Sequence, residues 1–265
     1  MATYIQNFVR FVPLLKELVA RDIKIKYRRS VLGVLWTLLN PLLMMTVLSI
    51  VFSNIFKFDV ENFPLYLLSG QVIFNFFSDC TTSSMTSIIG SASLIKKIYI
   101  PKYLFVFSKA LSCSINLMSS FTALICVTLV MRMELHITLL LSVIPLLILI
   151  LFSLGVSMIL ATVAVKFRDI IHLYSVFTTA LLYLTPIIYP MSILPERIKT
   201  LVMLNPLTNI VMMFRDLYMY NSLPSFSSFA VAIVETVLMC VLGLYVFWQK
   251  QDEFILDLEV RAWKI

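Results

Sequence analysis

Charged residues are scarce in this sequence. Only 13% of the 265 residues are Asp, Glu, Lys or Arg, whereas 60% are hydrophobic and the mean hydropathy is +0.97. In an ordinary soluble domain about a quarter of the residues are charged. A soluble core is therefore excluded. Apolar runs of about 20 residues, the length that crosses a bilayer, recur along the chain and indicate an all-α polytopic membrane protein.

Glycine is also rare, and the five positions at which it occurs exclude a nucleotide site. No two of them have the spacing of a phosphate-binding loop (G-x-x-x-x-G-K-[ST]) or of a dinucleotide-binding turn (G-x-G-x-x-G). The glycines are Gly33, Gly70, Gly90, Gly155 and Gly243. We therefore expect that this chain does not hydrolyse ATP by itself and holds no cofactor.

Cysteine and histidine are few and isolated. The four cysteines lie in apolar segments without C-x-x-C spacing, and the two histidines stand alone near segment ends. These residues are Cys80, Cys113, Cys126, Cys240, His136 and His172. Paired carboxylates and Ser-His or Cys-His combinations are not recognisable either. No metal site and no catalytic residue is assigned, and we expect a transport subunit rather than an enzyme.

What the chain does contain is long apolar runs, which predict six membrane spans. We place them approximately at Val31–Phe56, Phe63–Ile89, Tyr103–Met131, His136–Val165, Ile170–Tyr189 and Phe229–Phe247. The second span is the weakest, because Gln71, Asn75 and Asp79 interrupt it. A cleaved signal peptide is excluded, because the run from Val31 to Phe52 is too long and no small-residue cleavage pattern follows it.

The distribution of Lys and Arg predicts the orientation of the spans. With the N-terminus in the cytoplasm, sixteen of the 21 basic residues fall on the cytoplasmic side, and the opposite topology would reverse this excess. Both chain ends are therefore predicted to be cytoplasmic. The basic cluster before the first span acts at least as an inside anchor, and it consists of Lys24, Lys26, Arg28 and Arg29. The amphipathic stretch around Pro13 predicts a helix lying in the inner interface.

Three charged residues fall inside the predicted spans. By the rise of a helix, Lys109 and Glu235 each lie about 9 Å inside the membrane, and Asp79 lies near the inner surface. Satisfied or snorkelling side chains explain all three, although Glu235 fits this explanation least well. A proton-driven carrier would show carboxylates or histidines deep in several helices, and no such relay is present in the sequence.

Two connections between spans are unusual. In the loop 91–105, Lys96 and Lys97 alternate with bulky apolar residues, which predicts a short amphipathic helix suited to docking on another protein. An inside anchor would explain the lysines but not the apolar residues. Prolines divide the outer connection 190–226 into apolar pieces too short to span, and there we expect re-entrant or interfacial helices.

Aromatic residues gather in residues 74–77 and 181–190 more densely than an interfacial belt requires. Aromatic faces stack on sugar rings, so a carbohydrate pathway is one use, although Phe also packs in any helix bundle. The predicted lining residues of such a pathway are Trp36, Phe74, Phe77, Tyr183 and Tyr189.

Four blocks, in this order, resemble the permease subunit of ABC-2-type polysaccharide exporters, which move O-antigen, capsular polymer or teichoic acid. They are the amphipathic N-terminal helix, RDIKIKYRRSVLGVLWTLLNPLL, LIKKIYIPK and PIIYPMSILPERIKTLVMLNPLTNIVMMFRDL. The resemblance covers nearly the whole chain. It treats residues 1–265 as one domain, with an interface helix at 1–30, the span bundle at 31–249 and a cytoplasmic tail at 250–265.

The resemblance implies an assembly in the bacterial cytoplasmic membrane. Two copies of this chain would form a homodimer with two copies of a P-loop ATPase, which would bind ATP and Mg²⁺. The loop helix would dock on the ATPase through Ser93, Leu94, Ile95, Lys96, Lys97 and Ile98. The outer segment would form an exit gate that includes Pro195, Asn205, Pro206 and Arg215. The basic cluster would face the diphosphate of an undecaprenyl-linked glycan.

Three alternatives stay open at this point. One is an ABC-2 exporter of another lipid or of a drug-like substrate. Another is a proton-coupled secondary transporter, which the absence of any partner ATPase would favour. The third is a membrane enzyme acting on lipid-linked sugars, which would need a catalytic acid or a metal site.

Overall fold

The computed structural model describes residues 2–28, 30–55, 60, 62–134 and 136–254. These residues form helices and contain no strand, which confirms the all-α prediction. The helices are α1 (Ala2–Lys26), α2 (Trp36–Ile55), α3 (Phe63–Met85), α4 (Ser87–Gly90), α5 (Ala92–Ile95), α6 (Tyr103–Val130), α7 (Thr138–Leu141), α8 (Val143–Lys166), α9 (Ile170–Leu184), α10 (Glu196–Met203), α11 (Pro206–Tyr218) and α12 (Phe226–Lys250). Short 3-10 turns precede α2 (Gly33–Leu35) and α10 (Met191–Ile193).

Four segments of the described chain are long and apolar enough to cross a membrane. They are Gly33–Phe52, Tyr103–Val130, Thr138–Lys166 and Phe226–Lys250, and they coincide with the first, third, fourth and sixth predicted spans. The second and fifth predicted spans do form helices. However, α3 carries the polar residues noted above, and α9 has only 15 residues. The six-span prediction is thus confirmed for four of its members.

Proline sets two of the helix ends, one of which the sequence prediction misplaced. The fifth helix stops at Leu184 rather than Tyr189, because Pro186 offers no backbone N–H and disfavours helix at the residue before it. Pro206 instead begins α11, where the missing N–H costs nothing. The second predicted span breaks at Thr86, between α3 and α4, rather than continuing to Ile89.

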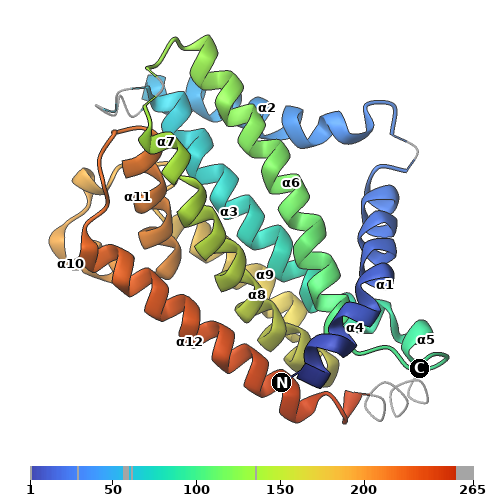
Figure 1. The fold of residues 1–265 in the computed structure, drawn as a ribbon. Helices are drawn as coiled ribbons and strands as arrows, with labels where there is room; N and C mark the ends of the chain where they lie inside the picture. Colours follow the sequence, from blue (N-terminus) through green and yellow to red (C-terminus); the bar gives the residue numbers. More distant parts are fainter. Residues whose placement is uncertain (1, 29, 56–59, 61, 135, 255–265) are drawn as a thin grey trace.

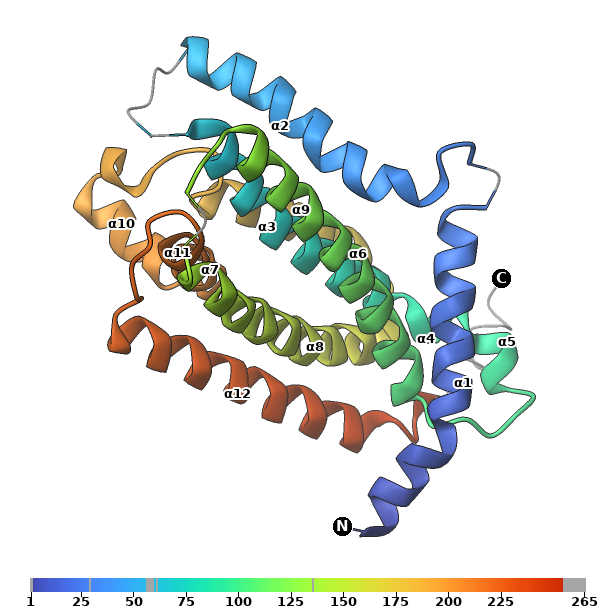
Figure 2. The same ribbon diagram turned by 45° about the horizontal axis from the view of Figure 1, so that its top comes forward.

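Helix α3 is the central element of the bundle. It packs against α2, α6, α8, α9 and α11, and most of its residues are buried (Figure 1). Its central position separates most of its surface from lipid, which explains how a membrane helix can carry several polar residues. Helix α2 lies across α3 and α6 with most of its surface open, and only 6% of its apolar window is buried (Figure 2).

Helices α8 and α12 approach each other closely at a pair of glycines. A Cβ atom on Gly155 would lie 2.6 Å from the carbonyl carbon of Met239, and one on Gly243 would collide with the carbonyl oxygen of Gly155. Small residues that allow close backbone approach are a usual basis of helix association in membranes. The two glycines therefore set the distance between α8 and α12.

The remaining helices gather at the two ends of the bundle (Figures 1 and 2). Helices α1, α4 and α5 and the last turn of α12 lie at one end, and α7, α10 and α11 lie at the other. Both termini of the described chain are therefore at the same end. That this end is cytoplasmic stays a prediction from the charge distribution.

Helix α1 is fastened to the end of the bundle. Leu15 and Leu18 are buried in a cluster with residues of α4, α6 and α12, and Pro13 is accommodated within the helix. The carboxylate of Asp22 is 3.0 Å from the ammonium of Lys109 on α6. Lys109 is thus one of the satisfied charges, and its partner on α1 is a residue that sequence analysis did not pair with it.

Candidate functional site

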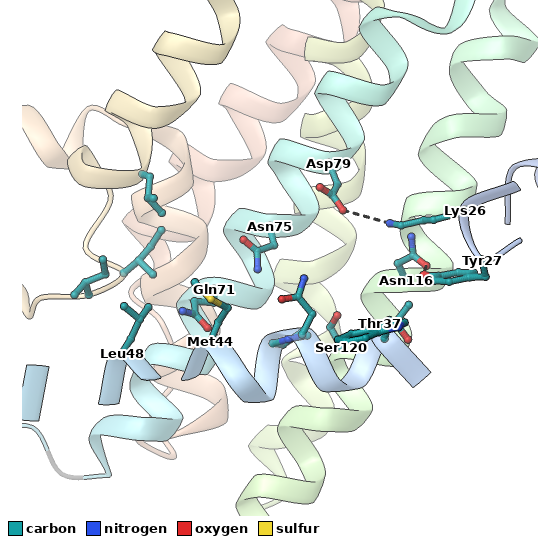
Figure 3. A pocket seen from close by; sticks show the side chains of 16 residues that line it. Lys26, Tyr27, Thr37, Met44, Leu48, Gln71, Asn75, Asp79, Asn116 and Ser120 are labelled. Carbon is teal, nitrogen blue, oxygen red and sulfur yellow. Dashed lines mark hydrogen bonds and ion pairs between the residues drawn. The ribbon is translucent and has the colours of Figure 1, made fainter. Parts of the chain in front are cut away.

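A groove of about 570 Å³ lies between α2, α3, α6 and the segment that follows α9. Figure 3 shows it from close by. Its lining residues come from four parts of the sequence: Lys26, Tyr27, Trp36, Thr37, Asn40, Pro41, Met44, Leu48, Gln71, Asn75, Asp79, Asn116, Ser120, Leu182, Ile187 and Ile188. The groove brings together polar side chains of α2, α3 and α6 that are far apart in the sequence.

One face of α3 presents a ladder of polar side chains to the groove. Gln71, Asn75 and Asp79 follow each other at intervals of four residues, so they lie one above the other over about 12 Å of helix. Figure 3 shows Asn75 and Asp79 on this helix opposite the side chains of α2 and α6. Across the groove, Asn116 and Ser120 of α6 add further hydrogen-bonding groups.

Gln71 is the deepest member of the ladder. Gln71 is only 7% exposed, and its Oε1 atom accepts no hydrogen bond within the described chain. A buried polar atom without a partner costs about 1–3 kcal/mol. The Gln71 amide is therefore available to a hydrogen-bond donor that enters the groove.

The ladder ends at an ion pair with the end of α1. The Lys26 ammonium lies 3.6 Å from the Asp79 carboxylate, and both side chains are about half exposed (Figure 3). Beside it, the Tyr27 hydroxyl donates a hydrogen bond of 3.1 Å to Asn116 Oδ1. Burial raises the pKa of Tyr27 above its ordinary value, so the phenol stays a neutral donor.

A second polar centre, the arginine clasp, lies next to the part of the groove that Ile187 lines. It consists of Arg215 on α11, Tyr66 and Ser69 on α3, and Pro186 and Ile187 in the turn after α9. Arg215 is only 3% exposed, and within the described chain it pairs with no carboxylate.

Backbone oxygens take the place of a counter-ion in the clasp. The Arg215 guanidinium donates to the carbonyls of Pro186 (2.6 Å), Tyr66 (3.0 Å) and Ile187 (3.2 Å), and to Ser69 Oγ (3.2 Å). It also lies over the Tyr66 ring, 3.5 Å from the centroid. Five donors in a planar fork suit this set of acceptors, and stacking on an aromatic face adds to it.

Two further features hold the same turn. The Tyr66 hydroxyl donates to the carbonyl of Tyr189 at 3.0 Å, and Asn205 Nδ2 donates to Thr185 Oγ1 at 2.9 Å. Asn205 also caps α11 by accepting from the backbone N–H of Leu207. The turn after α9 is therefore held by α3 from one side and by the start of α11 from the other.

The predicted outer-gate residues are thus not all in one place. Asn205, Pro206 and Arg215 belong to α11 and its cap, next to the turn, whereas Pro195 is exposed at the start of α10. Sequence analysis placed Arg215 among the outer residues but did not foresee its burial. The signal that could have indicated this burial is a single Arg within an apolar helix face.

The five predicted aromatic lining residues also separate. Trp36 lines the groove, while Phe74 and Phe77 are buried in the core, where Phe77 stacks on Phe152 at 5.9 Å. Tyr183 is exposed, and the Tyr189 hydroxyl donates to the Tyr183 carbonyl. Within one chain the groove is lined by amides and one carboxylate more than by aromatic rings.

The predicted ATPase-docking residues lie together at the α1 end of the bundle. Ser93, Leu94 and Ile95 are in α5, a helix of one turn, and Lys96, Lys97 and Ile98 follow it. Ile95 is buried against the bundle, whereas Ser93, Lys97 and Ile98 are exposed. The expected amphipathic helix is therefore shorter than its sequence pattern and continues as a turn.

The predicted headgroup residues lie at and after the end of α1. Lys24, Lys26 and Arg28 are exposed, and Arg29 lies outside the described residues. Only Lys26 of these lines the groove. No group of three or more His, Cys, Asp or Glu side chains in the described chain could hold a metal ion.

Sequence analysis noted the three ladder residues as interruptions of a span, and Asp79 also as a charge near the inner surface, but did not join them into one face. Their spacing of four residues on one predicted helix was the signal that could have identified them as one face. Which helices would lie opposite that face did not follow from the spacing.

The comparison with known proteins identifies the family. The model of the ABC-2 type transporter family matches residues 13–219, a range that contains the groove and the clasp. The chain belongs to this family of membrane proteins, as its sequence blocks predicted.

Several curated relatives are similar over almost their full length. The O-antigen export system permease protein RfbA of Klebsiella pneumoniae is 26% identical over 236 residues, which cover 88% of this chain and 90% of that protein. RfbA of Myxococcus xanthus is 26% identical over 256 residues, covering 96% and 98%. The polysialic acid transport protein KpsM of Escherichia coli is 21% identical over 243 residues, covering 91% and 94%.

Proposed function

We propose that this chain is the transmembrane permease of an ATP-driven exporter that moves a lipid-linked polysaccharide outward across the bacterial cytoplasmic membrane. The names of the relatives, O-antigen export permeases and a polysialic acid transport protein, support the class of substrate. Membership of the ABC-2 family supports a transporter rather than an enzyme.

The observation that carries this proposal is the polar ladder of α3 in the groove. A glycan presents many hydroxyl groups, each a donor and an acceptor, and side-chain amides offer both functions as well. Gln71, Asn75, Asn116 and Ser120 provide such groups along one passage. A hydrophobic drug or a simple lipid would not complete these hydrogen bonds, which disfavours the alternative ABC-2 substrates.

The architecture completes the proposal in several respects. Helices α3 and α9 join the four apolar spans to give six, α10 and α11 form re-entrant outer helices, and both termini are cytoplasmic. The whole chain is then one transmembrane domain that works as a homodimer. The open surface of α2 is a face on which a second copy can pack.

ATP hydrolysis belongs in this proposal to a partner chain with bound Mg²⁺. The exposed residues at and after α5, among them Ser93, Lys97 and Ile98, form the docking surface for that ATPase. Bulky apolar side chains beside lysines suit a groove with an acidic rim on the partner.

Purification from native membranes tests the proposal. The tagged chain is isolated in mild detergent and the co-purifying proteins are identified. Recovery of a P-loop ATPase in equal amount, with loss of the surface polysaccharide when the gene is deleted, is the expected result. Repeated recovery of the chain alone, with surface polysaccharide intact in the deletion strain, would favour a secondary transporter and would contradict the proposal.

A further inference from the structure

The ion pair between Lys26 and Asp79 points to a charge exchange at the entrance of the groove. We propose that Asp79 forms an ion pair with the Lys26 ammonium in the empty groove, and that a diphosphate anion replaces Asp79 in this pair. The groove then admits a diphosphate headgroup in preference to a neutral lipid. This inference rests on the proposed function, because it concerns the headgroup of the lipid-linked substrate.

The position of the pair is the first argument. Among the described residues that line the groove, Lys26 and Asp79 are the only two with a full charge. Lys26 is the last residue of α1, and Asp79 is the last member of the α3 ladder. An anion that enters the groove from the α1 end therefore meets this pair before it meets the amides of Asn75 and Gln71.

The exposure of the pair is the second argument. The Lys26 and Asp79 side chains are 48% and 61% exposed and lie 3.6 Å apart. The neighbouring pair of α1 and α6, Asp22 with Lys109, is 3.0 Å apart, and the Asp22 side chain is only 7% exposed. Exposed pairs contribute little to stability, whereas breaking a buried pair leaves an uncompensated charge. Of the two, the Lys26 pair is the one that can open without disturbing the fold.

The contacts of the neighbouring residue keep the backbone in place during such an exchange. Tyr27 is hydrogen-bonded to Asn116 of α6, and Asp22 holds the preceding turn of α1. Lys26 can thus swing its ammonium from Asp79 to a ligand while α1 stays attached to α6.

Charge decides the direction of the exchange. A carboxylate offers one negative charge, whereas a diphosphate offers more than one and has several oxygens to accept the three ammonium donors. A neutral sugar has no charge with which to displace Asp79. After the exchange, the freed carboxylate lies at the end of the ladder, where it can accept hydrogen bonds from glycan hydroxyls.

Binding measurements on the full chain test the proposal. The wild type, Asp79→Asn, Lys26→Gln and the double variant are placed in nanodiscs of zwitterionic lipid. Native mass spectrometry then measures the binding of inorganic diphosphate and, separately, of undecaprenyl diphosphate. Asp169→Asn is the matched control, because Asp169 is an exposed carboxylate that does not line the groove.

The exchange predicts opposite effects of the two single variants. Asp79→Asn should tighten diphosphate binding about two- to fivefold, the range of an exposed ion pair, and Lys26→Gln should weaken it by a similar factor. In the Lys26→Gln background, the gain from Asp79→Asn should be smaller, because only the relief of direct repulsion between the carboxylate and the diphosphate remains. Equal responses of the two ligands assign the site to the diphosphate group itself. A response of the lipid-borne ligand alone supports the same exchange with the lipid as its source.

The contrary results separate this inference from the proposed function. Binding by the wild type that Asp79→Asn leaves unchanged, or a gain that is equally large in the Lys26→Gln background, overturns the exchange and leaves the export function standing. A response confined to inorganic diphosphate overturns the lipid headgroup as the ligand. No binding of either ligand by the wild type overturns both the exchange and the lipid-linked substrate.

Discussion

Arg215 is a buried cation whose partners are almost all backbone oxygens. Three carbonyls and the Ser69 hydroxyl surround its guanidinium, and the Tyr66 ring covers one face. Placing a charge away from water is costly unless its hydrogen bonds are made. The clasp satisfies this condition with two carbonyls of the turn after α9 and with the Tyr66 carbonyl and Ser69 hydroxyl of α3, so one side chain connects α11, α3 and that turn.

Replacement of Arg215 by Lys should destabilise the protein although it keeps the charge. Lys lacks the planar fork and reaches fewer of the acceptors, so at least one buried carbonyl is left unpaired, at a cost of about 1–3 kcal/mol. The midpoint of thermal unfolding in detergent measures this effect. Arg197→Lys on the exposed face of α10 is the matched control, and equal midpoints for the two variants would contradict the clasp.

Gly70 gives an independent test of the same contact. A Cβ atom there would lie 2.7 Å from Arg215 Nη2 and 3.0 Å from Ile187 Cγ2, so Gly70→Ala should cost about 1–3 kcal/mol through overpacking. Gly90→Ala has no atom within 4 Å and should leave stability unchanged or slightly higher. Comparison of the two melting curves checks the prediction, and a stable Gly70→Ala variant would refute it.

Gln71 should show opposite effects on stability and on transport. Gln71→Leu removes a buried amide oxygen that has no partner, so the unfolding midpoint should stay equal or rise. Export should fall, because the groove loses a hydrogen-bonding group. Surface polysaccharide in a complemented deletion strain is the readout, and Gln249→Leu, exposed on α12, is the control. Unimpaired export by Gln71→Leu would remove Gln71 from the passage.

At the scale of the helices, close packing and polar residues belong to different elements. The α8–α12 pair is held by close approach at Gly155 and Gly243, and it carries much of the apolar surface that can face lipid. Helix α3 instead occupies the centre and carries the ladder, with α6 opposite it. A rigid apolar pair on one side thus supports a polar passage on the other.

The glycine contact predicts that α8 and α12 cannot tolerate even one added methyl group. Gly155→Ala would place a Cβ atom 2.6 Å from the backbone of Met239, and the helices would have to separate. A loss of thermal stability by several degrees is expected. Val241→Ala removes atoms from the exposed face of α12, the partner helix, and should have little effect. A normal midpoint for Gly155→Ala would show that the helices are not in this contact.

At the scale of the whole molecule, the two ends of the bundle contain different helices and different kinds of residue. The end that contains α1, α4 and α5 holds the basic residues of the predicted anchor and docking surface, and the opposite end holds the α10–α11 segment and the clasp (Figure 1). The groove connects the two ends, since Lys26 and Ile187 both line it.

Single-cysteine labelling should place the two ends on opposite sides of the membrane. In a chain whose four native cysteines are replaced, Lys97→Cys should react with a membrane-impermeant maleimide only when the cytoplasmic face is accessible. Lys199→Cys on α10 should react only from the outside. Both side chains are accessible in the structure, so accessibility alone does not favour either result. Labelling of both from one side would contradict the topology.

Local features of the sequence were enough to predict the class of this protein and most of its helices. Its apolar runs, its shortage of charge and the wrong spacing of its glycines sufficed to predict an all-helical membrane chain with no nucleotide site of its own. Prolines at 186 and 206 could also have marked the helix ends, because their effect on the backbone is local. These features depend on neighbours within a few residues.

The contact partners of the polar residues became known from the tertiary structure alone. Gln71, Asn75 and Asp79 share a helix face by spacing alone, but their neighbours Lys26, Asn116 and Ser120 come from other helices. Arg215 and Ser69 are 146 residues apart in the sequence, and Lys109 and Asp22 lie on different helices, α6 and α1. Periodicity tells which residues face the same way, but not which helix lies opposite, because that depends on how all the helices pack together.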